Sequence, residues 1–351
     1  MKKVLAFLLS AAMLLALAAC GGNQGGADTG TGGEGGEALH VGMICESLGT
    51  QSFNDDVLLG LETAVAELGI KEDHIEVREV SDAANSLRTL ISQGCTFMVV
   101  PSSSYRDAMV EVAEEYPDVK FLYLAAAEEG VDNIMSVEYK ENEAAFLAGA
   151  LAASLSKSGK IGTVLAVQEP LQLRYQYGYM AGAYMIDPAC EVTAVFTNSY
   201  SDTNIGKEMA TALYQQGADY VSCYAGACNL GVFAAADEAG DGSYCLGAAT
   251  GQFDKNPNKI VASVVKPIND AIVSVLKAYV ENGTFQGGTV SVWGLKEEGV
   301  GLRYTTMNDD LLASIPQEVL DKVEELKGQV SDGTIQVPGT AEEFEAFKAG
   351  R

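Results

Sequence analysis

Cysteine and histidine, the residue types that most often act as nucleophiles or metal ligands, are scarce and scattered in this sequence. The 351 residues contain seven cysteines and two histidines, His40 and His74, with no Cys-x-x-Cys pair and no Cys/His cluster. A structural zinc site takes about four such ligands at short spacings, so the sequence predicts no metal site. Apart from Cys20, most of the cysteines stand in or beside apolar runs, and we expect buried thiols, with one disulfide as the alternative. These six are Cys45, Cys95, Cys190, Cys223, Cys228 and Cys245.

The sequence carries no motif of a common enzyme class: no P-loop, no G-x-S-x-G elbow and no H-E-x-x-H. Glu128 and Glu129 could do acid–base chemistry as a pair, but adjacent loop carboxylates are more often simply solvated. Gly30, Gly32 and Gly35 fit G-x-G-x-x-G, yet they precede the first predicted strand, whereas a dinucleotide fingerprint follows one. We therefore predict no catalytic residue and no cofactor.

Cys20 differs from the other cysteines in what precedes it. An apolar run begins behind Lys2 and Lys3 and ends at 17–20 (Leu-Ala-Ala-Cys). A basic start, an apolar core and small residues before the cleavage point are typical of a secretory signal. The cysteine at this point resembles a bacterial lipobox, which implies that residues 1–19 are removed and that Cys20 is lipidated. We expect a domain anchored to the outer face of the cell membrane.

Composition limits what the rest of the chain does. Residues 20–37 are rich in Gly and are expected to form a flexible linker. The roughly 300 residues at 39–338 suffice for one large domain or two, and no second stretch is long and apolar enough to predict a membrane span. The formal net charge of −26 repels phosphate backbones, so nucleic-acid binding is not expected.

From residue 39 the sequence alternates short apolar runs with amphipathic stretches. In 55–69, apolar side chains recur at helical spacing along one stripe. Strands separated by helices of this length are typical of βαβ units and parallel sheets. The apolar runs are 39–45, 75–80, 97–101 and 119–124, then 161–167, 192–196, 220–224 and 244–246.

The second half of the chain repeats the first. Residues 93–98 (Gln-Gly-Cys-Thr-Phe-Met) correspond without a gap to 216–221 (Gln-Gly-Ala-Asp-Tyr-Val), 123 positions later. At the same offset, 113–115 (Ala-Glu-Glu) corresponds to 236–238 (Ala-Asp-Glu). We therefore predict an α/β protein of two similar, doubly wound parallel-sheet lobes.

Such a duplication predicts where a ligand binds. In open α/β sheets, ligands lie beyond the carboxyl ends of the strands. Two lobes that face each other would form a cleft between their strand-end loops and could close on a small molecule by a hinge. The predicted cleft loops are 45–51, 101–105, 125–128, 166–173, 200–202, 225–229 and 248–252.

Eight segments support a family resemblance: 49–55 (Gly-Thr-Gln-Ser-Phe-Asn-Asp), 143–149 (Glu-Ala-Ala-Phe-Leu-Ala-Gly), 177–182, 199–202, 213–219, 230–233, 263–266 and 294–301. In unbroken order over 39–338, the chain resembles the basic membrane protein family of substrate-binding lipoproteins, the nucleoside-binding type related to the purine nucleoside receptor A of spirochaetes. The resemblance implies a type I periplasmic-binding-protein fold with three hinge crossovers. It also implies delivery of purine or other nucleosides to an ABC permease.

We expect the chain to be shared between the lobes as this fold requires. The predicted N-terminal lobe takes 38–140 and 250–286. The predicted C-terminal lobe takes 141–249 and 287–338, and 339–351 are expected to form a tail.

The resemblance implies ligand contacts for four residues. Phe53 matches an aromatic that stacks on the base, a contact worth about 1–3 kcal/mol; the alternative is a hydrophobic staple at the helix start. Glu46 matches an acid that accepts a hydrogen bond from the base, or is a solvated loop carboxylate. Lys266 matches a cleft lysine that donates to sugar hydroxyls or a carbonyl, or is a surface lysine. Asn54 contacts the ligand or caps a helix.

Further candidates lie on the loops expected from the second lobe. Tyr200 is a candidate second aromatic wall. Asp202 matches a family motif, but its place just before a predicted helix is equally typical of an N-cap. Gly226 and Asn229 follow the strand that ends at Tyr224, where backbone can approach a ligand closely.

The sequence departs from the family pattern in two places. Ala249 stands where relatives carry an Asp that grips the ribose hydroxyls, and Thr250 could replace that acceptor only weakly. Ser102 and Ser103 belong to a run of three serines where relatives have a Gly-rich loop or an acid. The ligand is therefore left open among nucleosides, nucleobases, modified nucleosides and other small polar metabolites.

The expected partners are this ligand, the permease subunits and, through the anchor, the membrane; we expect a monomer. The alternative function is that of a sensor presenting a signal molecule to a membrane receptor, since it would use the same hinge and cleft.

Overall fold

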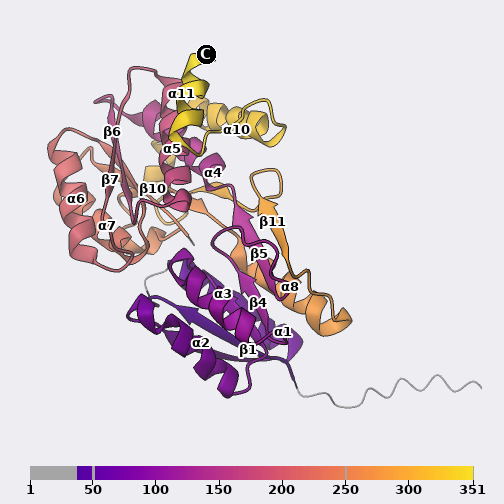
Figure 1. Ribbon diagram of the computed structural model, residues 1–351. Coiled ribbons are helices and arrows are strands. Elements are labelled where there is room, and N and C mark those ends of the chain that lie inside the picture. Colours follow the sequence, from indigo (N-terminus) through magenta and orange to yellow (C-terminus); the bar gives the residue numbers. More distant parts are fainter. Residues whose placement is uncertain (1–37, 50–51, 250, 351) are drawn as a thin grey trace, which may run out of the picture. The chain divides into compact units, whose positions relative to one another are not determined.

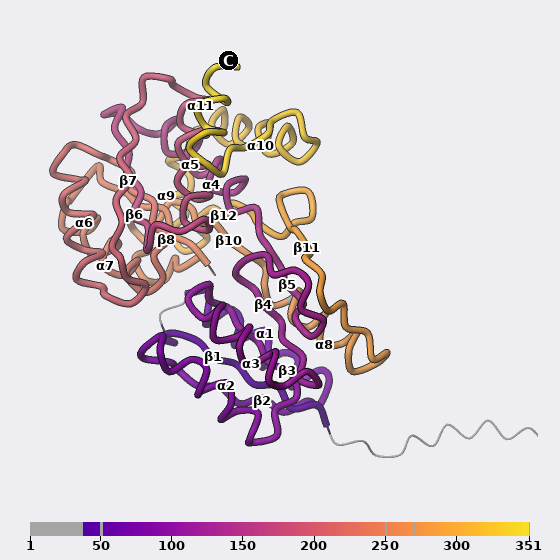
Figure 2. Tube along the Cα trace, viewed as in Figure 1, coloured from indigo at the N-terminus to yellow at the C-terminus, as the bar shows by residue number. Residues whose placement is uncertain are grey.

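The computed structural model describes residues 38–49, 52–249 and 251–350, apart from the side chain of Asp270. The predicted signal peptide, the linker, Cys20 and Thr250 lie outside the described residues. From Ala38 onward the chain forms one unit, in which two six-stranded sheets are flanked by helices (Figures 1 and 2).

The first sheet has the strand order β11-β5-β4-β3-β1-β2, and all its pairs are parallel. Successive side chains of a strand point to opposite faces: along β3, Phe97 and Val99 enter one core, and Met98 and Val100 enter another. The strands are β1 (His40–Cys45), β2 (Lys71–Glu76), β3 (Phe97–Val100), β4 (Lys120–Tyr123), β5 (Ile134–Tyr139) and β11 (Thr289–Trp293).

The second sheet has the corresponding order β12-β10-β9-β8-β6-β7. Its pairs are parallel except that of β10 with β12, which is antiparallel. The strands are β6 (Lys160–Leu165), β7 (Glu191–Phe196), β8 (Tyr220–Tyr224), β9 (Tyr244–Gly247), β10 (Ile260–Val265) and β12 (Gly301–Tyr304).

Helices cover both faces of each sheet, as parallel sheets require. On the first sheet, α1 packs with α8, and α2 packs with α3; on the second, α4 packs with α5, and α6 packs with α7. The helices are α1 (Phe53–Leu68), α2 (Ala83–Ser92), α3 (Arg106–Glu115), α4 (Glu141–Leu155), α5 (Pro170–Ile186), α6 (Thr203–Gln215), α7 (Asn229–Glu238), α8 (Ile268–Asn282), α9 (Asp309–Ala313), α10 (Gln317–Ser331) and α11 (Ala341–Ala349).

The predicted 123-residue repeat is confirmed at the turns that follow α2 and α6. Gly94 and Gly217 both have positive φ, +99° and +96°, a conformation that glycine adopts without steric cost. The next residue donates its N–H to an equivalent carbonyl in each turn, Cys95 to Leu90 and Ala218 to Leu213, at 3.1 Å in both. The repeat therefore reflects two copies of one helix–turn–strand unit.

Three segments cross between the lobes. The first joins β5 to α4, the second joins β10 to α8, and the third joins β11 to β12. This arrangement confirms the predicted fold, two doubly wound α/β lobes of the type I periplasmic-binding kind with hinge crossovers.

Strand pairing divides the chain differently from the predicted lobe boundaries. Residues 260–265, expected in the N-terminal lobe, form β10 of the second sheet, and 289–293, expected in the C-terminal lobe, form β11 of the first. Each lobe completes its fifth strand before the chain crosses over, so β10 corresponds to β5. Residues 341–349, within the expected tail, form α11, whose Phe344 is buried.

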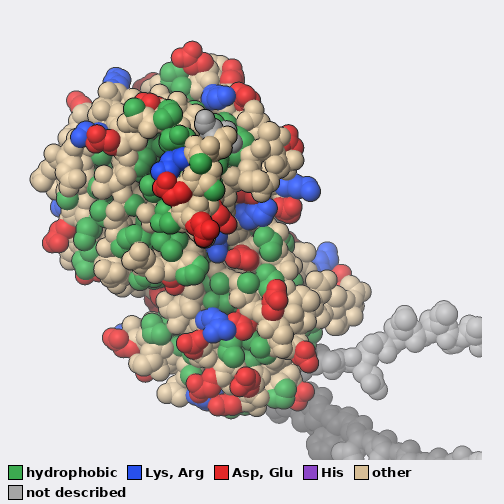
Figure 3. Space-filling model, turned by 45° about the horizontal axis from the view of Figure 1, so that its top comes forward, with side chains coloured by type: hydrophobic (Ala, Val, Ile, Leu, Met, Phe, Trp, Pro, Cys, Tyr) green, Lys and Arg blue, Asp and Glu red, His purple; other side chains and the backbone are tan. Residues whose placement is uncertain are grey.

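The six cysteines of the described residues are free thiols, and all but the half-buried Cys190 are buried. Among these same residues, none of the helices combines the length and the apolar character needed to cross a membrane. Acidic side chains are spread from one lobe to the other over the face shown in Figure 3.

Candidate functional site

One pocket lies between the lobes at the carboxyl ends of the strands, where doubly wound sheets place their ligands. It is lined by 21 residues from both lobes, and "the pocket" below refers to this set. Nine of the predicted ligand-binding residues are among them: Glu46, Phe53, Asn54, Ser102, Ser103, Tyr200, Gly226, Asn229 and Lys266.

Glu46, one residue beyond β1, is held in place by neutral donors. Its Oε1 accepts from Ser102 Oγ at 2.5 Å, and its Oε2 accepts from Asn54 Nδ2 at 3.0 Å. Asn54 therefore orients Glu46 instead of capping α1, where Asp55 Oδ2 accepts from Ser52 N at 2.9 Å. A carboxylate fixed this way can accept a hydrogen bond from a ligand N–H.

Phe53 is the first residue of α1 and lines the pocket. Its ring lies edge-on to the Tyr139 ring, with centroids 6.4 Å apart. The Lys266 Nζ lies 4.9 Å from the centroid of the Phe53 ring. The helix start therefore presents an aromatic surface to the pocket beside a cation.

Lys266 follows β10 directly and is not the surface lysine of the alternative interpretation, because its side chain is only 8 % exposed. Its Nζ donates to Glu141 Oε1 at 2.8 Å. Two further rings face Nζ, those of Tyr139 at 4.8 Å and Tyr175 at 5.7 Å from their centroids. Burial lowers the pKa of Lys266, and the Glu141 carboxylate opposes that shift.

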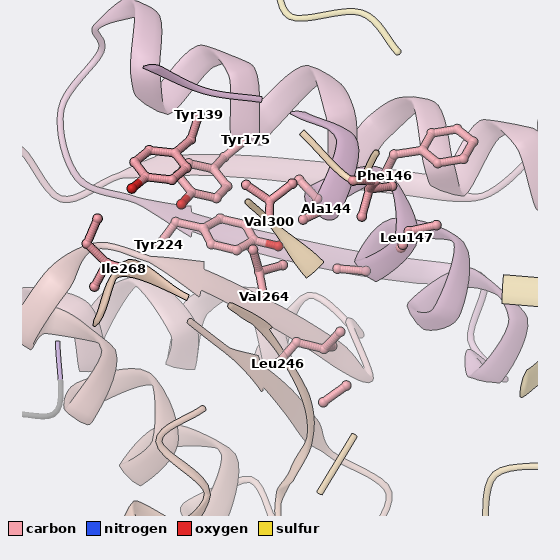
Figure 4. Close-up of a cluster of buried hydrophobic side chains, with 14 of the residues drawn as sticks. Tyr139, Ala144, Phe146, Leu147, Tyr175, Tyr224, Leu246, Val264, Ile268 and Val300 are labelled. Carbon is pink, nitrogen blue, oxygen red and sulfur yellow. The ribbon is translucent and has the colours of Figure 1, made fainter. Parts of the chain in front are cut away.

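Tyr175 and Tyr224 form a second aromatic wall that the sequence analysis did not identify. Their rings stack with centroids 4.2 Å apart and an angle of 11° between planes, and both line the pocket. Figure 4 shows this pair beside Tyr139. Tyr224 ends a predicted strand run, and this position could have identified it as a cleft residue. Tyr175 lies inside a helix that is apolar on most sides, so the sequence pattern does not distinguish it from core residues.

Comparison with known proteins identifies the family. Residues 39–340 match the family described as ABC transporter substrate-binding protein, PnrA-like. The chain belongs to this family.

Curated relatives agree with the match. The chain is 28 % identical over 359 residues to the ABC transporter nucleoside-binding protein BmpA of Lactococcus lactis, covering 96 % of the chain and 99 % of the relative. It is 26 % identical over 325 residues to basic membrane protein A of Borreliella burgdorferi, covering 91 % of the chain and 93 % of the relative.

Solved structures agree on the fold. A solute-binding protein of an ABC transporter system from Aeropyrum pernix is similar with a TM-score of 0.80 and 25 % identity, covering 89 % of this chain and 98 % of that one. A transcriptional activator of the comK gene from Bacillus halodurans shares the fold with a TM-score of 0.69 at 21 % identity, covering 85 % and 99 %.

Membership of the PnrA-like family makes the chain a solute-binding protein of ABC transporters, a class of extracytoplasmic proteins rather than a class of enzymes. Its partners are a small-molecule ligand and a permease. The geometry of the pocket between two hinged lobes agrees with this assignment.

Asp202 does not line the pocket of this PnrA-like protein. Its Oδ1 accepts from Asn204 N at 3.0 Å and from Ile205 N at 3.3 Å, so it caps α6. The N-cap, which was the alternative interpretation of Asp202, is therefore the role that the structure shows.

Tyr200 and Ser103 meet at a carboxylate that lies in a predicted cleft loop, 166–173, but was not among the candidate residues. Glu169 Oε1 accepts from Tyr200 OH at 2.6 Å and from Ser103 Oγ at 2.8 Å. Ser103 belongs to the first lobe and Glu169 to the second, so this group joins the lobes beside the pocket.

Gly226 and Asn229 shape the loop after β8. Gly226 has φ +58°, and a Cβ there would lie 2.7 Å from the Tyr200 carbonyl oxygen, so the position requires glycine. Asn229 Oδ1 accepts from Ala225 N at 2.9 Å, and its Nδ2 donates to Gln252 Oε1 at 3.1 Å. The Asn229 side chain is thus engaged in holding this loop.

One group of potential metal ligands occurs among the described residues, away from the pocket: His40, Asp73 and Cys95, with ligand atoms within 4.8 Å of one another. His40 Nε2 and Asp73 Oδ2 pair with each other at 2.8 Å. Burial raises the pKa of the Cys95 thiol to about 12, which disfavours the thiolate that binds metals.

Proposed function

We propose that this chain is a lipid-anchored, extracytoplasmic solute-binding protein that captures a nucleoside, or a related purine or pyrimidine metabolite, for an ABC permease. The observation that supports this ligand class is the set of aromatic rings that line one pocket, Phe53 from the first lobe and the Tyr175–Tyr224 stack from the second. Flat aromatic faces suit a nucleobase, which stacks on them.

Hydrogen-bonding groups complement these faces. Glu46, oriented by Ser102 and Asn54, would accept from a base N–H. Lys266 would donate to a carbonyl or a hydroxyl, since an ammonium has three N–H donors and one of them points to Glu141. The named activity of the Lactococcus lactis relative is consistent with this ligand class.

Ala249, which lines the pocket in place of the family's Asp, supports a ligand held chiefly through its base. Because Ala249 offers no side-chain acceptor, a ribose would gain less from this pocket than from one built to pair its hydroxyls. We propose that affinity depends more on the base than on the sugar.

A thermal-shift panel of nucleosides, nucleobases and sugars tests the ligand class, because a ligand that binds only the folded protein raises the melting temperature. We expect a rise with purine or pyrimidine compounds and none with free sugars. A rise with sugars alone, or with none of the panel, would contradict the proposal.

Transport is proposed over sensing because the family is one of ABC substrate-binding proteins. The test is whether purified permease, reconstituted in vesicles, takes up the ligand only when this protein is present. We further propose that the protein acts as a monomer. We also propose that it leaves its ligand chemically unchanged, and mass spectrometry of the recovered ligand would check this second point.

A further inference from the structure

The Lys266 ammonium belongs to a chain of four charged side chains that extends away from the pocket. Glu141 accepts from Lys266 Nζ at 2.8 Å through Oε1 and from Arg174 Nε at 2.8 Å through Oε2. Arg174 Nη1 in turn donates to Glu138 Oε1 at 3.0 Å. Two cations and two carboxylates therefore balance one another in this cluster.

Glu141 is the most buried member of this cluster, with a side chain that is 0 % exposed, and it does not line the pocket. A buried carboxylate is costly unless it is paired and hydrogen-bonded. Both of its oxygens have a cationic donor, so the cost is offset. Its place in the fold therefore needs an explanation other than ligand contact.

That place is the junction of two crossovers. Glu141 begins α4, just after the first crossover from β5, and Lys266 lies on the second crossover, just after β10. Their ion pair thus links the two segments of chain that must bend if the lobes move. From this junction, Nζ also faces Phe53 of the first lobe and Tyr175 of the second.

An ammonium buried among aromatic rings needs a carboxylate to stay charged. Desolvation favours the neutral amine, while ring faces attract the cation only modestly. Among the described residues, Glu141 is the acceptor that Nζ reaches, and the neighbouring Arg174 acts against the charge on Lys266. Removing the charge of Glu141 would therefore leave two cations with one carboxylate, that of Glu138, which contacts Arg174 and not Lys266.

We propose that Glu141 is a positioning residue of the pocket, which keeps Lys266 charged and directed at the ligand from the junction of the two crossovers. This inference rests on the proposed function, because that function supplies the ligand. Its first test, however, needs no ligand. The competing role is purely structural: Glu141 would then only join α4 to its neighbours, with no effect on the ionisation of Lys266.

The first test needs no ligand. Carbon-13 NMR of labelled lysine follows the Lys266 Cε signal with pH, and the signal is assigned by its loss in Lys266→Met. We expect Glu141→Gln, which keeps the shape but not the charge, to lower the titration midpoint of Lys266 by at least one pH unit. Glu138→Gln is the matched control, because Glu138 contacts Arg174 but not Lys266, and should leave the midpoint within a few tenths of a unit. Equal midpoints in Glu141→Gln and the unaltered protein would overturn the proposal.

The second test uses the nucleoside that raises the melting temperature most. Glu141→Gln should bind it at least tenfold more weakly at pH 7.5, and affinity should fall further as pH rises, because a lysine with a lowered pKa loses its proton first. The unaltered protein and Glu138→Gln should show no such fall between pH 6 and pH 8.5. A weaker but pH-independent affinity in Glu141→Gln would indicate the structural role and refute ours.

The two proposals can fail separately. If no nucleoside binds the unaltered protein, the proposed ligand class fails, and the NMR midpoints still decide the role of Glu141. If Glu141→Gln does not fold, Glu141→Asp keeps the charge while shortening its reach, and a lowered Lys266 midpoint in that variant supports the same conclusion. An unchanged midpoint in Glu141→Asp with weakened binding would contradict it.

Discussion

At the scale of single residues, three polar side chains of the pocket already have partners. Glu46 is held by two donors, Lys266 by Glu141, and Tyr200 by Glu169. Such pre-oriented groups lose little freedom when a ligand arrives. The aromatic rings are the parts of the pocket left to make new contacts, so they should dominate affinity.

Phe53 gives the sharpest prediction at this scale. Phe53→Ala should weaken nucleoside binding at least tenfold, which corresponds to about 1.4 kcal/mol or more, because the ring that faces the base is lost. Phe53→Tyr keeps the ring and is the matched control. Isothermal titration calorimetry measures both, and an unchanged affinity for the alanine variant would refute stacking.

At the scale of elements, α1 carries the pocket residue Phe53 at its first turn and an unusual acid just behind it. Asp56 is 5 % exposed, and its Oδ2 has no hydrogen-bond partner within the described residues. Burial, followed by the nearby Asp55, raises the pKa of Asp56 to about 7, while Arg303 opposes this shift. The folded protein therefore binds this proton more tightly than the unfolded chain does.

Stability should depend on pH through Asp56. Because its pKa is raised on folding, its contribution is present at low pH and is lost as pH rises from about 4 through about 7. We expect Asp56→Asn to reduce the fall in melting temperature between pH 5 and pH 8. Asp107→Asn changes an exposed acid and serves as control. Parallel pH profiles for Asp56→Asn and the unaltered protein would contradict the prediction.

Close packing of α4 against α5 gives a second prediction for elements. A Cβ at Gly182 would lie 1.9 Å from the Phe146 carbonyl oxygen, so Gly182→Ala must push the helices apart. We expect a loss of about 1–3 kcal/mol or more, as for other overpacked sites. Gly328→Ala in α10 meets no atom within 4 Å and should stabilise by up to about 1 kcal/mol. Urea unfolding of both variants checks the contrast.

At the scale of the whole molecule, negative charge strongly exceeds positive charge. The formal net charge is −26, Glu46 lines the pocket, and the charge of Lys266 is already balanced by Glu141. A further negative charge on the ligand therefore meets repulsion without a free cation among the pocket residues to answer it.

Ligand charge should accordingly decide binding. We expect the 5′-monophosphate of a bound nucleoside to bind at least tenfold more weakly than the nucleoside itself, with a smaller difference at high salt, since ions screen the long-range part of the repulsion. Competition binding at two ionic strengths measures this. Equal or tighter binding of the monophosphate would show that the pocket holds a usable cation.

Membrane attachment is a further prediction at this scale, and it rests on sequence alone. Cys20→Ala should move the protein from the membrane fraction to the soluble fraction, because the acyl chains would have no thiol to join. Detergent partitioning and mass spectrometry of the mature N-terminus check it. A mature N-terminus of the unaltered protein that carries no added mass from acyl chains would contradict lipidation.

The sequence by itself determined the two-lobe α/β fold, because the 123-residue repeat and the alternation of strands and helices depend on local periodicity. It also predicted Glu46 in a cleft loop, because strand ends are local features that this fold brings together, whereas Phe53 and Lys266 were expected in the pocket from the family resemblance. The family motifs supplied their expected roles.

Only the tertiary structure decided which contacts cross from one segment to another. The assignment of β10 and β11 to their sheets depends on pairing between distant strands, which no local pattern encodes. For the same reason, the Tyr175–Tyr224 stack, the Ser103–Glu169 bond and the Glu141–Lys266 pair, which spans 125 positions, were beyond the reach of sequence periodicity. Side chains that meet through the fold of the chain leave no signal in their spacing.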